Sequence, residues 1–245
     1  MKEELPIVID GELGKLRGII HKATIPCKGI VILLHGYFSS TKLGPVNLYV
    51  QIARLFAQQG YEFWRIDSFG VGDSDGDFIQ SSFELRIKDY KTITELALQN
   101  NKNLAYLGHS MGTNFAIYLA NCYADFVKRI FLLSPSFGNI TWFDNLLNTN
   151  QQNQLYTEGI VERKGLTVTK EFIEYIFSDE IYLEIEKCKT KCIVFYATSD
   201  EFYNMQSIIK SVKYMSDFEL FEIENSDHNF LSNRKLLIDI IKAKI

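Results

Sequence analysis

The chain has 245 residues, and 30 acidic against 26 basic side chains give it a formal net charge of −4. Apolar residue types make up 47% of the sequence, which excludes a mainly disordered chain at so low a net charge. The length fits one large domain, or one domain that carries an insertion. The acidic balance is against a nucleic-acid-binding protein, because such proteins need basic surface to neutralise phosphates.

No targeting or membrane segment is predicted. Residues 1–6 (MKEELP) are too polar to begin a secretory signal peptide, and no apolar stretch follows them. The longest apolar run, Ile30 to Leu34, is far shorter than the ~20 residues of a spanning helix. The cysteines are interpreted as reduced structural thiols, with a metal or redox pair at Cys188 and Cys192 as a less favoured alternative. Together these features indicate a cytoplasmic protein without a metal.

The predicted elements alternate between strand and helix along most of the chain. It starts with a hairpin-like pair of strands at 7–10 and 16–22. Apolar strands then alternate with amphipathic helices, which is typical of a mostly parallel sheet with right-handed crossovers. The later strands are predicted at 29–34, 62–66, 104–107, 130–133, 192–196 and 219–223, and the helices at 48–59, 83–97, 110–123, 205–215 and 232–244.

The alternation stops between residues 135 and 188. No confident strand is found there, so we expect a largely helical insertion into an α/β domain formed by residues 1–134 and 189–245. The polar run at 148–153 (NTNQQN) is expected to be a loop. The insertion is rich in aromatic residues, some of which pack it onto the core and some of which line an apolar pocket. The candidates for that pocket are Trp142, Phe143 and Tyr175.

The pentapeptide Gly108-His109-Ser110-Met111-Gly112 lies between a predicted buried strand and a predicted helix. That is the context of the G-x-S-x-G turn, whose strained backbone lifts the serine hydroxyl over the carboxyl edge of the sheet. Glycines are needed at both ends because side chains there would collide with the neighbouring strand and helix. We therefore predict that Ser110 is a nucleophile, and a plain strand–helix turn with a capping serine is the alternative.

A serine nucleophile requires a base, and the chain has four histidines. His21 lies in the first hairpin, far from the carboxyl edge of the sheet. His35 follows the first buried strand, and the side chain of His109 is expected to point away from that of its neighbour Ser110. His228 lies in the loop after the last strand, at the carboxyl edge, and is the predicted base.

The acid that orients this histidine is expected after another strand, between the serine and the histidine in chain order. Asp200 fits this position, because it follows the predicted strand at 192–196. The adjacent Glu201 is the alternative. Asp227 is next to His228 in sequence but cannot easily bend back to its imidazole ring.

A tetrahedral intermediate also needs two backbone N–H donors, one after the nucleophile and one in the loop after the first buried strand. We assign them to Met111 and Tyr37. In the same loop, His35 and Gly36 are supporting residues, and His35 is expected to brace the backbone rather than bind substrate. The glycine-rich segment 70–76 (GVGDSDG) lacks the Lys-Ser/Thr of a phosphate loop, so it is interpreted as a tight turn beneath the oxyanion loop.

Together these motifs resemble the α/β-hydrolase superfamily. They are similar to its branch of serine aminopeptidases and monoacylglycerol-lipase-like hydrolases, which includes bacterial cinnamoyl and feruloyl esterases. The resemblance covers residues 29–134 and 190–245, and it implies the roles given above for Ser110, His228 and Asp200. It also implies a lid at residues 135–188. The matching residues are Leu34-His35-Gly36-Tyr37, residues 67–76 (DSFGVGDSDG), the pentapeptide around Ser110, Asp200 and Asp227-His228-Asn229-Phe230.

We therefore expect a serine hydrolase that cleaves a carboxylic ester with an apolar acyl or aryl group through an acyl-enzyme, without a cofactor. A thioesterase or a hydrolase of small peptides with the same residues is the main alternative. A non-catalytic ligand-binding protein of this fold is less favoured, because the set of Ser, His and Asp is intact. The expected partner is a small-molecule substrate.

Overall fold

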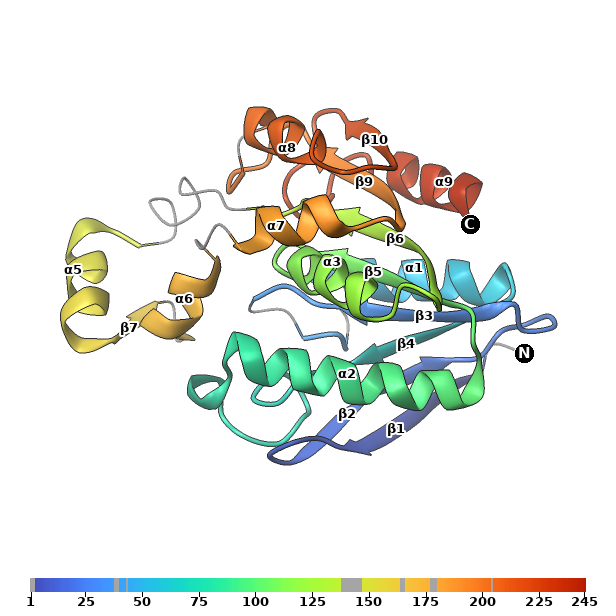
Figure 1. Cartoon of the computed structure of the whole chain (residues 1–245), viewed down its shortest axis with the longest axis horizontal. Helices are drawn as coiled ribbons and strands as arrows, with labels where there is room; N and C mark the ends of the chain where they lie inside the picture. The colour runs from blue at the N-terminus through green and yellow to red at the C-terminus, as the bar shows by residue number, and fades with distance from the viewer. Residues whose placement is uncertain are drawn as a thin grey trace.

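Among the residues that the structure describes, eight strands pair into one sheet through the middle of the molecule (Figure 1). The structure is a computed structural model and describes residues 3–37, 40–42, 44–137, 147–163, 166–176, 180–203 and 205–245. The strands of the sheet are β1 (Glu4–Asp10), β2 (Lys15–His21), β3 (Gly29–Leu34), β4 (Tyr61–Ile66), β5 (Leu104–His109), β6 (Val127–Leu133), β9 (Lys191–Ala197) and β10 (Phe218–Ile223).

The strand order is β1-β2-β4-β3-β5-β6-β9-β10. β1 and β2 form an antiparallel hairpin that joins β4 antiparallel, and every neighbouring pair from β4 to β10 is parallel. All residues of β3 and β5 are buried, which explains why these strands show no polar alternation. The predicted mostly parallel sheet is confirmed, and its parallel strands end at one shared edge.

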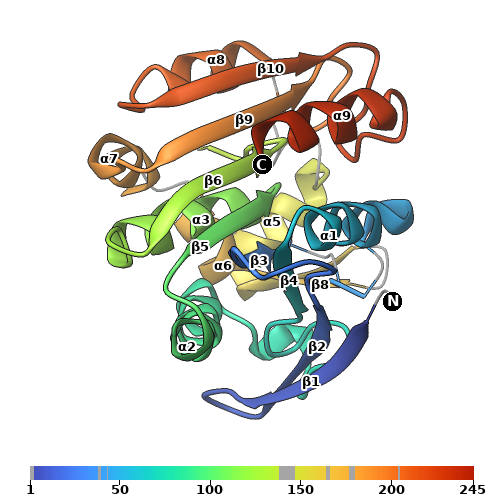
Figure 2. The ribbon, with the colours of Figure 1, turned by 90° about the vertical axis from the view of Figure 1, so that its right-hand side faces the viewer.

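Helices cover both faces of this sheet, as Figure 2 shows. The helices on one face are α1 (Leu48–Gln58) and α9 (Arg234–Lys244), and those on the other are α2 (Phe83–Asn100), α3 (Gly112–Cys122) and α8 (Met205–Val212). The side chains of the strands divide into two apolar clusters, one beneath each set of helices. This is the expected consequence of a sheet that buries both of its faces.

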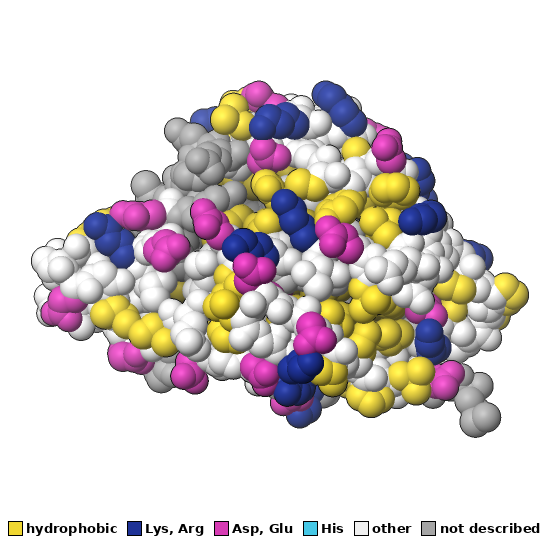
Figure 3. Space-filling view, turned by 60° about the horizontal axis from the view of Figure 1, so that its bottom comes forward, with side chains coloured by type: hydrophobic (Ala, Val, Ile, Leu, Met, Phe, Trp, Pro, Cys, Tyr) yellow, Lys and Arg dark blue, Asp and Glu magenta, His cyan; other side chains and the backbone are white. Residues whose placement is uncertain are grey.

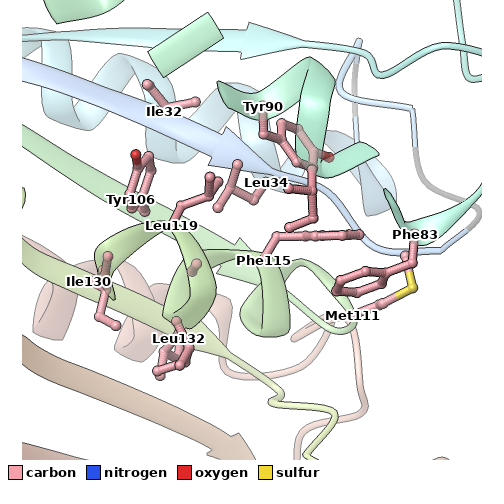
Figure 4. Close-up of a cluster of buried hydrophobic side chains, with 14 of the residues drawn as sticks. Ile32, Leu34, Phe83, Tyr90, Tyr106, Met111, Phe115, Leu119, Ile130 and Leu132 are labelled. Atoms are coloured by element: carbon pink, nitrogen blue, oxygen red, sulfur yellow. The ribbon is translucent and has the colours of Figure 1, made fainter. Parts of the chain in front are cut away.

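The start of α3 is anchored in the larger of these clusters (Figure 4). The side chain of Met111 is 2% exposed, and the rings of Phe83 and Phe115 stack with their centroids 4.3 Å apart. Leu34, the last residue of β3, belongs to the same cluster. Apolar packing therefore fixes the backbone on both sides of the predicted oxyanion hole.

The inserted segment contains a pair of short strands besides its helices, which corrects the expectation that it holds no strand. Its described elements are α5 (Thr149–Glu158), β7 (Ile160–Arg163), β8 (Leu166–Thr169), α6 (Lys170–Ile176) and α7 (Glu180–Lys187). β7 and β8 pair as an antiparallel hairpin, where no strand was expected. In Figure 1, α5, β7 and α6 project beyond one end of the sheet.

The polar run expected to be a loop is the beginning of α5. Asn148 caps this helix, because its side chain accepts a hydrogen bond from the backbone N–H of Gln151 at 3.0 Å. The Gln151 side chain in turn accepts one from the backbone N–H of Asn148 at 3.1 Å. This reciprocal capping box satisfies two N–H groups that a helix start leaves without partners, and so it favours a helix in a polar sequence.

On the face shown in Figure 3, basic and acidic side chains are interspersed. Within the described part of the chain, no helix is long and apolar enough to cross a membrane. Within the same part, no three His, Cys, Asp or Glu side chains are grouped so that they could hold a metal ion. Cys27 and Cys122 are exposed, whereas Cys188 and Cys192 are buried, and both buried thiols donate to the carbonyl of Thr190.

Candidate active site

Ser110 lies on the sharp turn between β5 and α3 and has a φ angle of +55°. A non-glycine residue in the left-handed region is strained, and such strain is concentrated at functional sites. The close packing of the turn explains its glycines. A Cβ at Gly112 would lie 1.9 Å from the carbonyl oxygen of Leu34, and one at Gly108 would lie 2.7 Å from Cα of Thr113. The partly exposed Ser110 side chain is therefore held at the carboxyl edge of the sheet.

Asp200 and His228 meet at the same edge, from the loops that follow β9 and β10. Nδ1 of His228 lies 2.7 Å from Oδ2 of Asp200, and both side chains are buried. The other carboxylate oxygen, Oδ1, accepts backbone N–H groups from Phe202 at 2.9 Å and Tyr203 at 3.0 Å. An ionised carboxylate can only accept a hydrogen bond, so Nδ1 of His228 is the ring nitrogen that carries the proton. The other ring nitrogen, Nε2, keeps a free lone pair.

The alternative acid, Glu201, has a different position. Its Oε2 accepts the backbone N–H of His228 at 3.2 Å and so bonds to the main chain of that residue, not to its ring. The structure therefore places Asp200 against the imidazole and Glu201 against the backbone behind it.

Tyr203, which the sequence did not single out, contacts both the predicted acid and the predicted base. Its ring centroid lies 5.4 Å from that of His228, and its backbone N–H donates to Oδ1 of Asp200 at 3.0 Å. No local sequence signal identifies this residue, because its contacts join segments far apart in the chain.

The backbone carbonyl of His228 is held by two further side chains. Oγ of Ser134 donates to it at 2.9 Å, and Nε2 of His109 lies 3.2 Å from it. A carbonyl only accepts, so Nε2 of His109 carries the proton, and Nδ1 accepts the Tyr49 hydroxyl proton at 2.7 Å. Burial first, and then the nearby His228, lower the pKa of His109 to about 3. His109 is thus a neutral donor that fixes the loop carrying His228.

His35 is similarly buried and neutral, under the predicted oxyanion loop. Its Nδ1 donates to the carbonyl of Gly36 at 2.8 Å, and its Nε2 accepts from the backbone N–H of Ser68 at 3.2 Å. Burial and then the nearby charge of Arg86 lower its pKa to about 3. Nη2 of Arg86 donates to the carbonyl of Tyr37 at 3.1 Å. Both side chains support the backbone of this loop from below, and His35 has the bracing contacts expected of it.

The side chain of Tyr37 faces the insertion. Its ring packs edge to face on Phe78 with the centroids 5.1 Å apart, and the short helix that begins at Phe78 lies against β8. Burial raises the pKa of the Tyr37 hydroxyl far above its usual value. Of the predicted pocket residues, Trp142 and Phe143 lie outside the described residues, as does the side chain of Tyr175.

Two features define the α/β-hydrolase fold. One is the mostly parallel sheet with helices on both faces, and the other is a serine on the turn between strand β5 and the helix that follows it. The sequence matches the family model described as serine aminopeptidase, S33 (Hydrolase_4), over residues 25–184. The protein therefore belongs to this family of hydrolases, which confirms the branch predicted from the motifs.

Solved structures agree with this assignment at the level of the fold. Est1E from Butyrivibrio proteoclasticus, in a structure with ferulic acid bound, is 17% identical over 97% of each chain, with a TM-score of 0.86. The mouse alpha/beta hydrolase domain-containing protein 10 is 17% identical over 98% of each chain, with a TM-score of 0.75. The thioesterase domain from the curacin biosynthetic pathway is 14% identical over 98% of this chain and 99% of that one, with a TM-score of 0.69. No curated protein sequence matches the chain.

Proposed function

We propose that the protein is a serine ester hydrolase that works through an acyl-enzyme. The observation that carries this proposal is the contact of 2.7 Å between Nδ1 of His228 and Asp200, at the sheet edge where Ser110 lies on its strained turn. The Asp200 carboxylate fixes the imidazole tautomer, so that Nε2 is the nitrogen able to take a proton from a serine hydroxyl.

The reaction proceeds in two halves. In the first, Ser110 attacks the ester carbonyl while Nε2 of His228 takes its proton, and the imidazolium then gives that proton to the leaving alcohol. In the second, a water molecule that gives its proton to His228 attacks the acyl group and releases the acid. The backbone N–H groups of Met111 and Tyr37 stabilise the oxyanion in both halves.

The substrate class is an ester with an apolar acyl or aryl group. Support comes from the aromatic composition of the insertion, in which Trp142, Phe143 and Tyr175 are the proposed pocket residues. Est1E, which shares the fold, binds ferulic acid, an aromatic acid. A thioester is the second candidate, because the curacin thioesterase domain has the same fold. The family description also keeps short peptides as candidates.

The decisive test is hydrolysis of p-nitrophenyl butyrate by the wild type and by Ser110→Ala. We expect the substitution to lower kcat by on the order of 10⁶-fold, since a triad without its nucleophile loses nearly all of its rate enhancement. Ser211→Ala is the matched control, because Ser211 is a buried serine on α8 whose hydroxyl donates to the carbonyl of Ser207 in the same helix. A fluorophosphonate should label Ser110 in the wild type. Retained turnover in Ser110→Ala would refute the proposal.

A second measurement decides between the substrate classes. An oxygen ester, a thioester and an amide with the same butyryl group are compared by kcat/KM. An esterase favours the oxygen ester, and a clear preference for the thioester or the amide would replace the substrate class while leaving the nucleophile assignment intact.

A further inference from the structure

A cavity of about 270 Å³ lies beside the end of the sheet formed by β1, β2 and β4 (Figure 2). Ile19 of β2 pairs with Pro6 of β1 on one side and with Arg65 of β4 on the other. Directly paired residues project from the same face of a sheet, so these three side chains share one wall of the cavity. Among the described residues that line it, none belongs to the proposed triad or donates to the proposed oxyanion hole.

Arg65 is a buried cation in this wall, and its residue is only 2% exposed. Its Nε donates to Nε2 of His21 at 2.8 Å, and its Nη1 donates to the backbone carbonyls of Thr41 and Lys42. Its third nitrogen, Nη2, makes no hydrogen bond within the described part of the chain. Because a guanidinium carries five N–H donors in a fixed planar fork, the two on Nη2 are left for a ligand.

The other charged side chains of the cavity are paired elsewhere. Arg17 forms an ion pair with Asp75, and Nζ of Lys42 lies 2.9 Å from Oδ2 of Asp73. Arg65 itself forms no ion pair with any described residue. Burial lowers its pKa to about 10, so it stays cationic at neutral pH. A buried charge without a contacting partner of opposite sign is costly, and an anion in the cavity would remove that cost.

The two polar neighbours of Arg65 do not neutralise it. His21 is neutral, because burial and then the charge of Arg65 lower its pKa to about 4. Asp67 forms no ion pair with Arg65, and its oxygens already accept hydrogen bonds from the Ser40 hydroxyl at 3.2 Å and from two backbone N–H groups. The donors on Nη2 are therefore available to a carboxylate from outside the chain.

We propose that this cavity binds a small monocarboxylic acid as its anion, with the carboxylate on Nη2 of Arg65 and the apolar tail against β1 and β2. The inference goes beyond the proposed function and does not depend on it. Hydrogen bonds between a guanidinium and a carboxylate are charge-assisted and stronger than neutral ones. The carboxylate would supply the negative charge that the described neighbours of Arg65 do not provide.

The walls of the cavity set the chemical class of this ligand. Val8 pairs with Arg17, two residues before Ile19, and so adds apolar surface on the same face. Asp67 and Asp73 also line the cavity, and they would repel a dianion such as phosphate more strongly than a single carboxylate. The volume is below that of most sites for drug-sized ligands, which limits the tail to a short chain or one ring.

The test is calorimetric titration of hexanoate into Val8→Glu and Val8→Gln at pH 7. Val8 is 58% exposed, so both substitutions are expected to leave the urea midpoint unchanged. The glutamate brings its own carboxylate to the cavity and competes with hexanoate for Arg65, whereas glutamine has the same size without the charge. Loss of a hydrogen bond to a charged group lowers affinity by about 10-fold or more, so the Kd of Val8→Glu should exceed that of Val8→Gln by at least this factor. Hexanoate bound at the proposed active site would contribute equally to both titrations.

Two further titrations make the proposal falsifiable at the ligand and at Arg65. In the wild type, 1-hexanol, which has the same tail without the charge, should bind at least about 10-fold more weakly than hexanoate. Arg65→Met should lose this hexanoate site, and if that variant does not fold, the pair at position 8 still decides. Equal Kd values in Val8→Glu and Val8→Gln, or equal binding of hexanol and hexanoate, would overturn the inference. Tighter binding of inorganic phosphate than of hexanoate would overturn the monocarboxylate class.

Discussion

Gly112→Ala tests the close approach of α3 to β3, on which the geometry of the site depends. The added Cβ would lie 1.9 Å from the carbonyl oxygen of Leu34, whereas real Cβ atoms essentially never come within 3.0 Å of such an atom. The strand and the helix must therefore separate by at least about 1 Å. Forcing excess volume into a packed core costs on the order of 3 kcal/mol, so we expect the free energy of unfolding to fall by about that amount.

The same displacement should reach the active site, because Leu34 directly precedes the loop that carries Tyr37. A shift of about 1 Å in a catalytic group lowers the rate by about 100-fold, so kcat/KM should fall to about 1% of wild type. The measurements are urea unfolding followed by circular dichroism, and ester hydrolysis normalised to active-site titration.

Gly159→Ala is the control for this prediction. A Cβ at Gly159 meets nothing within 4 Å, and only its φ of +76° opposes the substitution. It should cost about 1 kcal/mol of stability from left-handed strain and leave kcat/KM per active site unchanged. A Gly112→Ala protein with wild-type stability and kcat/KM would refute the reasoning, because the contact with Leu34 would then carry no constraint.

Two further predictions concern stability and thiol chemistry. His35 and His109 have a pKa of about 3 in the folded protein against 6.5 when unperturbed, so their contribution to stability is fully present above about pH 6.5 and declines as the pH falls toward 3. As the pH falls through that window, each of the two histidines should reduce the free energy of unfolding by about 1.4 kcal/mol per pH unit. Urea unfolding measures this, and an equal urea midpoint at pH 7 and pH 5 would contradict the prediction. A colorimetric disulfide reagent should react with the exposed Cys27 and Cys122 in the native protein, and with the buried Cys188 and Cys192 only after unfolding. Rapid reaction of all four thiols in the native protein would contradict this burial.

Much of the fold was predictable because its signals are local. Continuous apolar runs such as the one in β3 fit strands buried on both faces, and the sequence order of strands and helices then leaves few topologies. The glycines of the turn around Ser110 were predictable for the same reason, since their requirement follows from the turn itself.

The β7–β8 hairpin was missed because each strand has only four residues, too few to show an alternating pattern. The available signal was the β-branched content of these two segments, which are separated by only two residues, one of them the glycine at position 165. The residues that hold His228 in place could not be found in this way. His109, Ser134 and Tyr203 reach their partners across strands β5, β6 and β9, and such contacts exist only once the sheet has formed.

The ring of Tyr37 packs on Phe78, and the short helix that begins at Phe78 lies against β8, so the loop that carries a proposed oxyanion donor is packed indirectly on the inserted segment. The two parts are therefore not separable modules. A chimera that receives the insertion of another family member loses or alters this support, and its turnover should change on every ester tested, not only its choice among acyl groups. Variation that broadens the substrate range of this protein without reducing its rate must then preserve the packing of β8 against the helix at Phe78 while changing side chains elsewhere in the insertion.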